Sequence, residues 1–531
     1  MRITNKIMQR NNLSNINTNK IYQDILSTQM STQKKINRPS DDPVVAIRAL
    51  RLRSNVTEVT QYYSKNIPDA KSWLSVTEGA LDNLSKVITN MIEQCTKGSN
   101  GDLKTADRKI VLEQLKALGE EVYATGDADY AGRYVFTGYR TDTSLSFPEE
   151  KELKYTITEQ LDKSVLDSVT KVDMGKLKDI NSSNYNDAAL GMDAITDQDI
   201  SSVDVYRIRL AYNNCSDYDN GGELKIQFTD PTKPAPVPFA PNTEWSQANG
   251  TIEVIHSYDD PYTAAAGAAN ADRVIYVPET GEILLGENRY KELMATKDNE
   301  NTKENESEIR ITYEKSSWQK GDLRPEHYFY CTSYPEDGAP IEYNDTYLKG
   351  DPERQKIEYD VGFNQTIHVN STADECFQHG VGREVDDIVS AMQDVLDLEG
   401  VKANLETMLK NVEPDSENEK ILKRQMEAVD KALTLAKDKE QKLFENGITA
   451  FQGYLDDADL SITNCGTRSS KLSLIENRMQ NQKTTFETLK SENEDVDITE
   501  VAIHLSSAEL TYEAALMASG KVMQTSLLNF I

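Results

Sequence analysis

The sequence predicts an α+β fold: an elongated helical bundle built from the N- and C-terminal segments, with a β-rich domain inserted between them. At both ends, apolar residues recur in alternating steps of three and four, the spacing of helices that pack against other helices. From about residue 147 to 366, short β-branched and aromatic runs alternate with Pro-rich and acidic stretches, which is typical of strands and loops. The two ends should therefore form one bundle beside the insert.

The composition limits the classes of function. A chain of 531 residues suggests three or four domains. Its formal charge of -30 argues against nucleic acid as a partner, because phosphate binding needs a basic surface. We find no signal-peptide core and no apolar run long enough to span a membrane, so a protein of this sequence that leaves the cell is expected to do so without a cleaved signal. The cysteines form no CxxC motif and are expected to be isolated thiols: Cys95, Cys215, Cys331, Cys376 and Cys465.

Residues 1–36 carry apolar residues at loose helical spacing among Asn, Thr, Gln and Lys. This composition is poor for an independent helix, so we expect a helix that depends on a partner. The residues predicted to make its assembly contacts are Ile3, Ile7, Leu13, Ile21 and Ile25.

The segment INRPSDDP, residues 36–43, predicts a sharp joint between two helices. Pro39 disfavours the helical conformation at Arg38, so the first helix should end there. Asp42 followed by Pro43 predicts an N-cap carboxylate and a proline at the first helical position. The predicted joint comprises Pro39, Ser40, Asp41, Asp42 and Pro43.

Helical spacing continues over residues 44–66 and 69–97, and a third helix carries Val111, Leu115, Leu118 and Val122 on one face. Residues 132–141 predict a short strand or hairpin. Within the insert, the segment RVIYVPETGEILLG predicts a hairpin that turns at PETG. The other predicted strands are residues 205–212, 224–228, 251–258, 308–314, 327–334 and 356–361.

Helical heptads resume at residue 383, continue over 422–443, and form a further long helix over 472–489. The last stretch keeps a heptad seam for four repeats, and its predicted contact residues are Ile498, Val501, Leu505, Tyr512, Leu516, Val522, Met523, Leu527 and Phe530. Burial against one loose partner helix is too little to balance the backbone entropy of ordering this segment. Both ends are therefore expected to be disordered in the monomer, open to trypsin, and to fold on assembly.

The expected division is threefold. Residues 1–42 and 495–531 form an inner assembly domain, residues 43–146 and 367–494 form a helical bundle, and residues 147–366 form a β-rich outer domain of one or two subdomains.

Motifs for catalysis are absent from the sequence: it has no P-loop, no GxSxG elbow and no HExxH pair. The segment DYDNGGE, residues 217–223, lacks the ligand pattern of a calcium loop and is interpreted as an acidic turn. We therefore expect no catalytic, cofactor-binding or metal-binding residues, and no enzyme. An enzyme carried by the insert stays the alternative from a different class.

Several segments, taken in order, resemble the flagellin superfamily over about residues 1–147 and 360–531. They are MRIT at the start, STQKKINRPSDDP at 31–43, GRYVFTGYRT at 132–141, GTRSSKLSLIENRM at 466–479, EDVDITEVAIHL at 494–505 and SLLNFI at the end. PSDDPVVA and GRYVFTGY favour the hook–filament junction branch of this superfamily over flagellin itself, which is the second candidate. The sequence departs from the pattern at Gln33, where the family usually has Gly, and in its larger insert.

The resemblance implies a structural subunit of the bacterial flagellum, needed for filament assembly and motility, with a flagellin-like fold. The terminal helices would line the inner tube, the bundle would form the next shell, and the β domain would face outward. Export would use the flagellar type III apparatus, which leads to an extracellular location. The implied partners are further copies of the chain in a ring, hook-associated protein 1, flagellin and an export chaperone.

Overall fold

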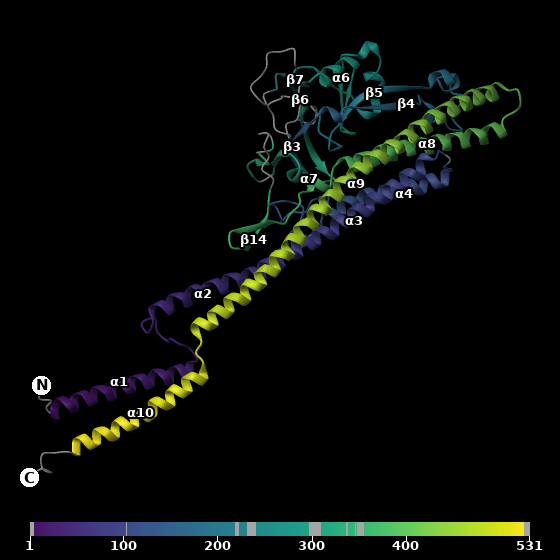
Figure 1. Ribbon diagram of the computed structural model, residues 1–531. Coiled ribbons are helices and arrows are strands. Elements are labelled where there is room, and N and C mark those ends of the chain that lie inside the picture. The colour runs from purple at the N-terminus through teal and green to yellow at the C-terminus, as the bar shows by residue number, and fades with distance from the viewer. Residues whose placement is uncertain are drawn as a thin grey trace, which may run out of the picture. The chain divides into compact units, whose positions relative to one another are not determined.

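The computed structural model describes residues 5–101, 103–217, 222–230, 241–296, 309–335, 338–345, 347 and 355–524. The predicted α+β fold, with long terminal helices and a central β-rich region, is confirmed (Figure 1). The chain divides into two compact units. The terminal unit comprises Met1–Lys71, Glu358–Ile367 and Ser470–Ile531, and the central unit comprises Ser72–Ile357 and His368–Ser469. The threefold division expected from the sequence stays a prediction.

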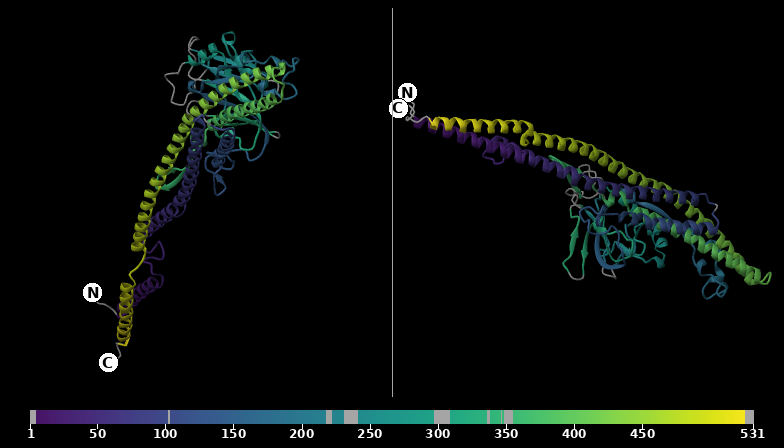
Figure 2. Two further views of the ribbon diagram at one scale, coloured as in Figure 1. Left: turned by 90° about the vertical axis from the view of Figure 1, so that its right-hand side faces the viewer. Right: turned by 90° about the horizontal axis from the view of Figure 1, so that it is seen from below.

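The terminal unit is built around two helices that lie side by side in every view, α1 (Asn5–Thr32) and α10 (Ile498–Gln524) (Figures 1 and 2). Leu26, Val501 and Ala508 form their small buried core. The unit also contains α2 (Pro43–Gln61), the π-helix η1 (Tyr62–Asn66), the first residues of α3 (Ile67–Ser99), the last part of α9 (Glu417–Glu494), and the hairpin of β14 (Glu358–Gly362) and β15 (Gln365–His368).

The joint after α1 differs from its prediction at one end and agrees at the other. The helix ends at Thr32, before the predicted end at Arg38, because Gln33 adopts a left-handed backbone with φ of 59°. Its amide donates to the Gln29 carbonyl at 2.8 Å and closes the last turn. Helix α2 begins at Pro43. The Asp42 carboxylate accepts hydrogen bonds from the backbone amides of Val44 and Val45, as an N-cap does. The predicted cap is confirmed.

One helix, which contributes to both units, was predicted from the sequence as two helices. Residues 422–443 and 472–489 belong to the single helix α9 of 78 residues. Buried residues recur every seventh position through the stretch between them, at Phe444, Phe451, Ala458 and Cys465. This seam keeps the helix continuous despite its internal glycines. The central unit's other α-helices are α4 (Thr105–Gly126), α5 (Pro261–Ala265), α6 (Glu287–Met294), α7 (Ala373–Cys376) and α8 (Gly380–Asn411), beside most of α3.

A five-stranded sheet has the order β4-β5-β10-β9-β8. Its neighbours are antiparallel except β8 and β9, which are parallel. The strands β9 and β10 form the hairpin predicted at PETG. Their bounds are β4 (Asp167–Asp173), β5 (Ser201–Arg209), β8 (Ile252–Val254), β9 (Val274–Val277) and β10 (Glu282–Leu285).

A six-stranded antiparallel sheet has the order β13-β12-β3-β11-β6-β7. Its strands are β3 (Lys151–Leu161), β6 (Lys225–Phe228), β7 (Thr243–Ser246), β11 (Ile309–Trp318), β12 (Tyr330–Tyr334) and β13 (Ile341–Tyr343). The sequence missed β3, β4, β7, β13 and β15. The predicted hairpin at 132–141 is only β1 (Asp129–Tyr130) and β2 (Arg133–Tyr134).

An irregular segment, residues 174–200, covers one stretch of the α8–α9 helix pair. Its buried Met174, Leu177 and Met192 share a core with residues of both helices. The side-chain amide of Gln425, fully buried on α9, donates to the Tyr185 and Met192 carbonyls at 2.7 and 2.8 Å. The 3-10 turns of the unit are Lys163–Val165, Leu177–Asp179, Met192–Ala194, Asp197–Asp199, Ser257–Asp259, Ala268–Asn270 and Pro325–His327.

We predict that Gln33→Gly stabilises the C-terminal turn of α1. The left-handed conformation is unfavourable by about 1 kcal/mol for a residue with a Cβ, and glycine does not have this penalty. Hydrogen exchange at the amides of the last α1 turn should slow about fivefold. Thr32→Gly is the matched control: its backbone is helical, so exchange there should become faster. Slower exchange in both variants, or faster exchange in Gln33→Gly, would contradict the explanation.

Candidate functional site

The surface of α1 is divided in an unexpected way. Its least exposed positions follow the heptad spacing Asn12, Ile16, Asn19, Gln23 and Leu26, so the seam that faces α10 is largely polar. The predicted contact residues lie on the exposed remainder of the helix: Ile7, Leu13, Ile21 and Ile25. Ile3 lies outside the described residues. The structure therefore leaves the predicted α1 residues uncovered within this chain.

Helix α10 carries two apolar faces. Val501 is buried against α1, while Leu505 and Tyr512 are partly covered on the same side. A second stripe, Ile503, Leu510 and Met517, repeats every seven residues and is 65, 70 and 67% exposed. This outer stripe was not predicted from the sequence, although its seven-residue spacing was a signal for it. The predicted residues Ile498 and Leu516 are also exposed.

The remaining predicted α10 residues fall at the end of the helix. Val522 and Met523 lie within it, but their side chains are outside the described part of the chain, as are Leu527 and Phe530 entirely. Helix α2 adds further exposed apolar residues at Val44, Ile47 and Leu50.

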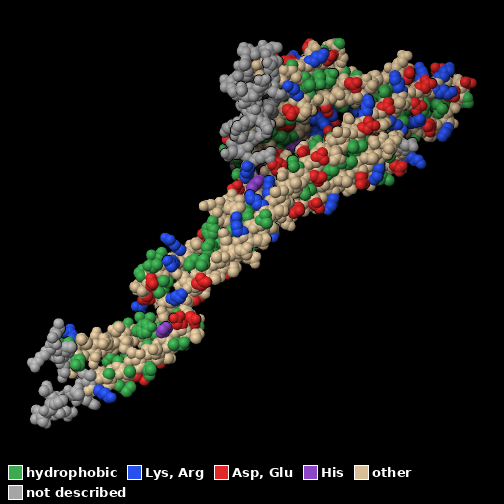
Figure 3. Space-filling view, in the orientation of Figure 1, with side chains coloured by type: hydrophobic (Ala, Val, Ile, Leu, Met, Phe, Trp, Pro, Cys, Tyr) green, Lys and Arg blue, Asp and Glu red, His purple; other side chains and the backbone are tan. Residues whose placement is uncertain are grey.

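Most exposed large apolar side chains that the structure describes lie in the terminal unit (Figure 3). Contiguous apolar surface on a soluble chain indicates an interaction site. We therefore name the exposed apolar residues of α1, α2 and α10 the candidate assembly surface.

A polar clasp joins the two linkers of the terminal unit. The backbone of Lys34 pairs with that of Asp495, and the Lys35 amide donates to the Glu494 carbonyl at 2.7 Å. Arg53 of α2 binds the Glu494 carboxylate through two nitrogens, at 2.7 and 2.8 Å. These hydrogen bonds lower the pKa of Glu494 below its ordinary value. The clasp holds residues 33–35 beside the start of the α10 linker.

The predicted joint residues lie next to this clasp in the chain. The Asp41 carboxylate accepts from the amides of Asn37 and Arg38, at 3.2 and 2.9 Å. Pro39 and Ser40 form the turn between them. Two consecutive aspartates thus fix the joint. Asp41 accepts hydrogen bonds from the residues before it, and Asp42 caps the helix that follows.

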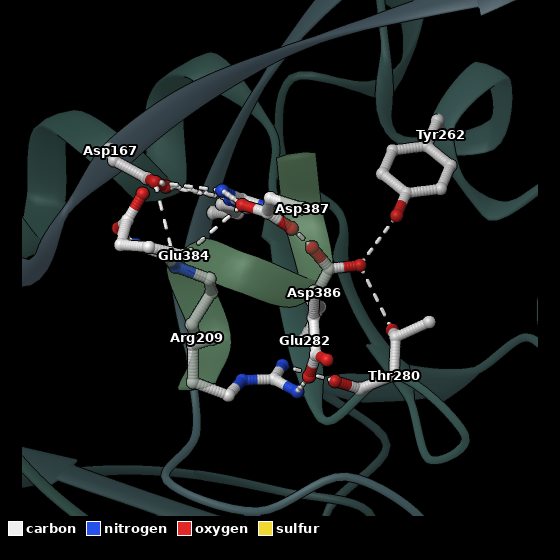
Figure 4. Close-up of polar contacts among 10 residues, drawn as sticks. Asp167, Arg209, Tyr262, Thr280, Glu282, Glu384, Asp386 and Asp387 are labelled. Carbon is white, nitrogen blue, oxygen red and sulfur yellow. Dashed lines mark hydrogen bonds and ion pairs between the residues drawn. The ribbon is translucent and has the colours of Figure 1, made fainter. Parts of the chain in front are cut away.

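In the central unit, a network of ion pairs connects α8 to the five-stranded sheet (Figure 4). The Arg207 side chain is 4% exposed and binds three carboxylates: Asp167 of β4 at 3.0 Å, Glu282 of β10 at 2.5 Å, and Asp387 of α8 at 2.5 Å. Arg209 adds Asp387 at 3.0 Å and Glu384. Each buried charge therefore has partners of opposite sign, which buried charges require.

The carboxylates of this network keep their charge because of the arginines. Burial by itself would raise the pKa of Asp387, but Arg207 and Arg209 beside it outweigh burial and lower that pKa. Glu282 accepts from the Tyr262 hydroxyl at 2.5 Å and the Thr280 hydroxyl at 2.9 Å. Sequence reasoning missed the network, and its signal was the pair of arginines at alternate positions of a predicted strand.

A second buried charge site lies in the six-stranded sheet. The Glu159 carboxylate on β3 accepts from the Tyr313 hydroxyl at 2.5 Å and the Ala211 amide at 2.9 Å, both on one oxygen. Burial raises the pKa of Glu159 to about 7, which outweighs these hydrogen bonds. Its charge therefore depends on pH near neutrality.

Among the described residues, no group of His, Cys, Asp and Glu has the arrangement of a metal site. The five cysteines are buried and free, as expected, and burial raises the pKa of Cys95 to about 12. Within the same part of the chain, no helix is both long and apolar enough to span a membrane.

The chain is similar to bacterial flagellins and, more particularly, to flagellar hook-associated proteins. Residues 3–141 match the family model described as the bacterial flagellin N-terminal helical region. The chain is also 31% identical over 153 residues to flagellar hook-associated protein 3 of Escherichia coli (strain K12), and 30% identical over 146 residues to the Salmonella typhimurium (strain LT2) protein of the same name.

These matches cover 28 and 27% of this chain, and 47 and 45% of the two relatives, so they span about half of each relative's length. The predicted resemblance to the flagellin superfamily and to hook-associated protein 3 is confirmed, and the relatives are structural proteins of the flagellum. A solved flagellar hook-associated protein 3 from Legionella pneumophila aligns over 78% of this chain and 97% of its own, at 11% identity. The TM-score of this alignment is 0.21.

We predict that Arg207→Met lowers the free energy of unfolding by about 3–5 kcal/mol, because the buried Glu282 and the less buried Asp167 and Asp387 lose their shared cation. Urea unfolding at pH 7 measures the change. Lys402→Met is the matched control, since Lys402 forms an exposed pair with Asp430 at 2.6 Å and its loss should cost at most about 1 kcal/mol. Equal effects of the two substitutions would contradict the role of the network.

We predict that Glu159→Gln removes a pH-dependent part of the stability. The folded pKa is raised from 4.5 to about 7, so this group's contribution is complete below pH 4.5 and is lost as pH rises through about 7. The loss amounts to about 3 kcal/mol over that range. Glutamine keeps the oxygen that accepts both hydrogen bonds and carries no charge.

The measurement is the difference in unfolding free energy between Glu159→Gln and the natural chain, from urea unfolding between pH 4.5 and 8. As pH rises, the unfolding free energy of Glu159→Gln should increase relative to that of the natural chain. Glu152→Gln, at an exposed position of the same strand, should show a flat difference. A flat difference for Glu159→Gln would refute the raised pKa.

Proposed function

We propose that this chain is a non-enzymatic structural subunit of the bacterial flagellum that joins the hook to the flagellin filament. The main observation behind this proposal is the candidate assembly surface: although α1 and α10 pack together, apolar residues of both helices remain exposed. The similarity to hook-associated protein 3 supports the junction role. The flagellin family model covers residues 3–141, which include the N-terminal helices that contribute to this surface. Filament assembly and motility then depend on the chain.

The partners in this proposal are further copies of the chain in a ring, hook-associated protein 1 on the hook side and flagellin on the filament side. An export chaperone would cover the C-terminal helix before assembly, and the chain would reach the extracellular flagellum without a cleaved signal. That both ends fold only on assembly stays a prediction. The second candidate, a filament flagellin, predicts a different deletion phenotype: loss of the filament subunit itself.

A clean gene deletion separates the two roles. A junction subunit leaves hooks on the cell while unpolymerised flagellin escapes into the medium, whereas a filament subunit leaves no flagellin from this gene to escape. Normal filaments in the deletion strain would refute both roles. Hydrolase activity in purified full-length protein, retained after removal of contaminating enzymes, would instead support an enzyme in the insert.

We predict that the double substitution Ile503→Asp and Leu510→Asp abolishes swimming in soft agar and retention of filaments on hooks. Both residues are exposed in the single chain, so its helix content, measured by circular dichroism, should not fall. Burying two carboxylates between subunits would oppose assembly. Leu460→Asp is the matched control, because Leu460 is 60% exposed on α9 in the central unit and should be tolerated. Normal swimming by the double variant would remove the α10 outer stripe from the assembly surface.

A further inference from the structure

A pocket of about 810 Å³ lies in the central unit, next to the ion network. Strands β4 and β5 contribute Asp167 and Arg207 to its lining, α8 contributes Asp387, and α9 contributes Lys439 and Lys442. The volume falls in the range of sites for small molecules. Its lining is strongly charged, so the state of each charge decides what the pocket can bind.

The two arginines of the lining are already neutralised. Arg207 and Arg209 have three carboxylate partners each: those given above and, for Arg209, also Asp167 at 3.9 Å. Conversely, the carboxylates of Asp167, Glu384 and Asp387 are held by these arginines. None of these groups needs a ligand to satisfy its charge.

The lysines at this pocket are in a different state. Lys439 and Lys442 lie one turn apart on α9, and neither forms an ion pair or hydrogen bond with any residue in the described part of the chain. Lys171 of β4 lies with its ammonium 5.1 Å from the Tyr262 ring centre, and it too lacks a carboxylate partner among the described residues. The chain has 88 acidic and 58 basic residues, so neighbouring lysines without acidic partners are unexpected.

The surroundings of Lys439 disfavour its charged form. Burial lowers the pKa of its ammonium, and the nearby positive charge of Lys171 lowers it further, against the opposing effect of Asp394 and Asp387. A cation withdrawn from water next to a like charge is unfavourable unless an anion approaches it. An anion at Lys439 would relieve both effects.

We propose that this pocket binds a small multiply charged oxyanion, of the phosphate or dicarboxylate class, through Lys439 and Lys442. Lys171 strengthens the local positive potential from the β4 side. The paired carboxylates of Asp167 and Asp387 limit the anion to the α9 side, where the lysines stand. The ligand is therefore compact, because an extended polyanion would meet these carboxylates.

Calorimetric titration of the full chain tests the proposal, with inorganic phosphate and succinate as separate probes at constant ionic strength. Saturable binding of phosphate alone or succinate alone would support the site and assign its class, and binding of both would assign the shared oxyanion chemistry. Absence of saturable binding for both probes would overturn it.

Substitutions locate the binding. Lys439→Gln should weaken binding at least tenfold, and Lys442→Gln should weaken it to a smaller extent. The matched control is Lys410→Gln, at an exposed lysine on α8 that also lacks an ion pair among the described residues, and it should leave affinity unchanged. Equal affinity of Lys439→Gln and the natural chain would place the binding elsewhere and overturn the proposal.

The fold of the variant is checked independently. Lys439→Gln removes a partly buried charge that has a like charge nearby, so its melting temperature in anion-free buffer should stay the same or rise. Phosphate or succinate should then raise the melting temperature of the natural chain and not that of the variant. If Lys439→Gln does not fold, Lys439→Met, which has a similar length and no charge, serves the same comparison.

Discussion

The terminal unit depends on one constraint: α1 and α10 carry apolar residues around more of their circumference than a single partner helix can cover. Their shared core contains Leu26, Val501 and Ala508, while Asn12 and Asn19 lie in the same α1 seam. Polar residues in a helix seam fix register at the cost of stability. The pair is therefore held in place by a weak seam, and its stronger apolar stripes face outward.

The features that could be predicted from the sequence are those determined by residues close together in the chain. The Asp42 cap and the PETG hairpin follow from local chemistry, and both are present. The α1 seam could not be predicted in this way, because α1 offers both a polar and an apolar heptad and only the partner decides which is covered. The end of α1 at Thr32 was missed because a glutamine at the next position gives no signal for a left-handed backbone.

Long-range features were missed for a related reason. The partners of Arg207 come from β4, β10 and α8, which are distant in the sequence, so no spacing rule could assemble them. Helix α9 was predicted as two helices; its middle contains glycines, yet the buried seam from Phe444 to Cys465 runs through them. In both cases burial against other elements overrides the local preference of the residues.

Charge completes the contrast between the two units. The chain carries a formal charge of -30, and copies with such a charge repel one another. Helix α1 has Lys6, Arg10 and Lys20 against Asp24, whereas α10 has Glu500, Glu509 and Glu513 against Lys521, so the net charges of +2 and -2 cancel.

The helices that expose the most apolar surface are thus a locally neutral part of a strongly acidic chain. Repulsion between copies is smallest there, because screening at physiological salt limits the reach of distant charges to about 8 Å. The central unit satisfies its buried arginines internally and has no comparable outer stripe among its described helices. Association between chains therefore has a favourable route through the terminal helices, in which apolar burial is not opposed by the charge that keeps the rest of the molecule apart.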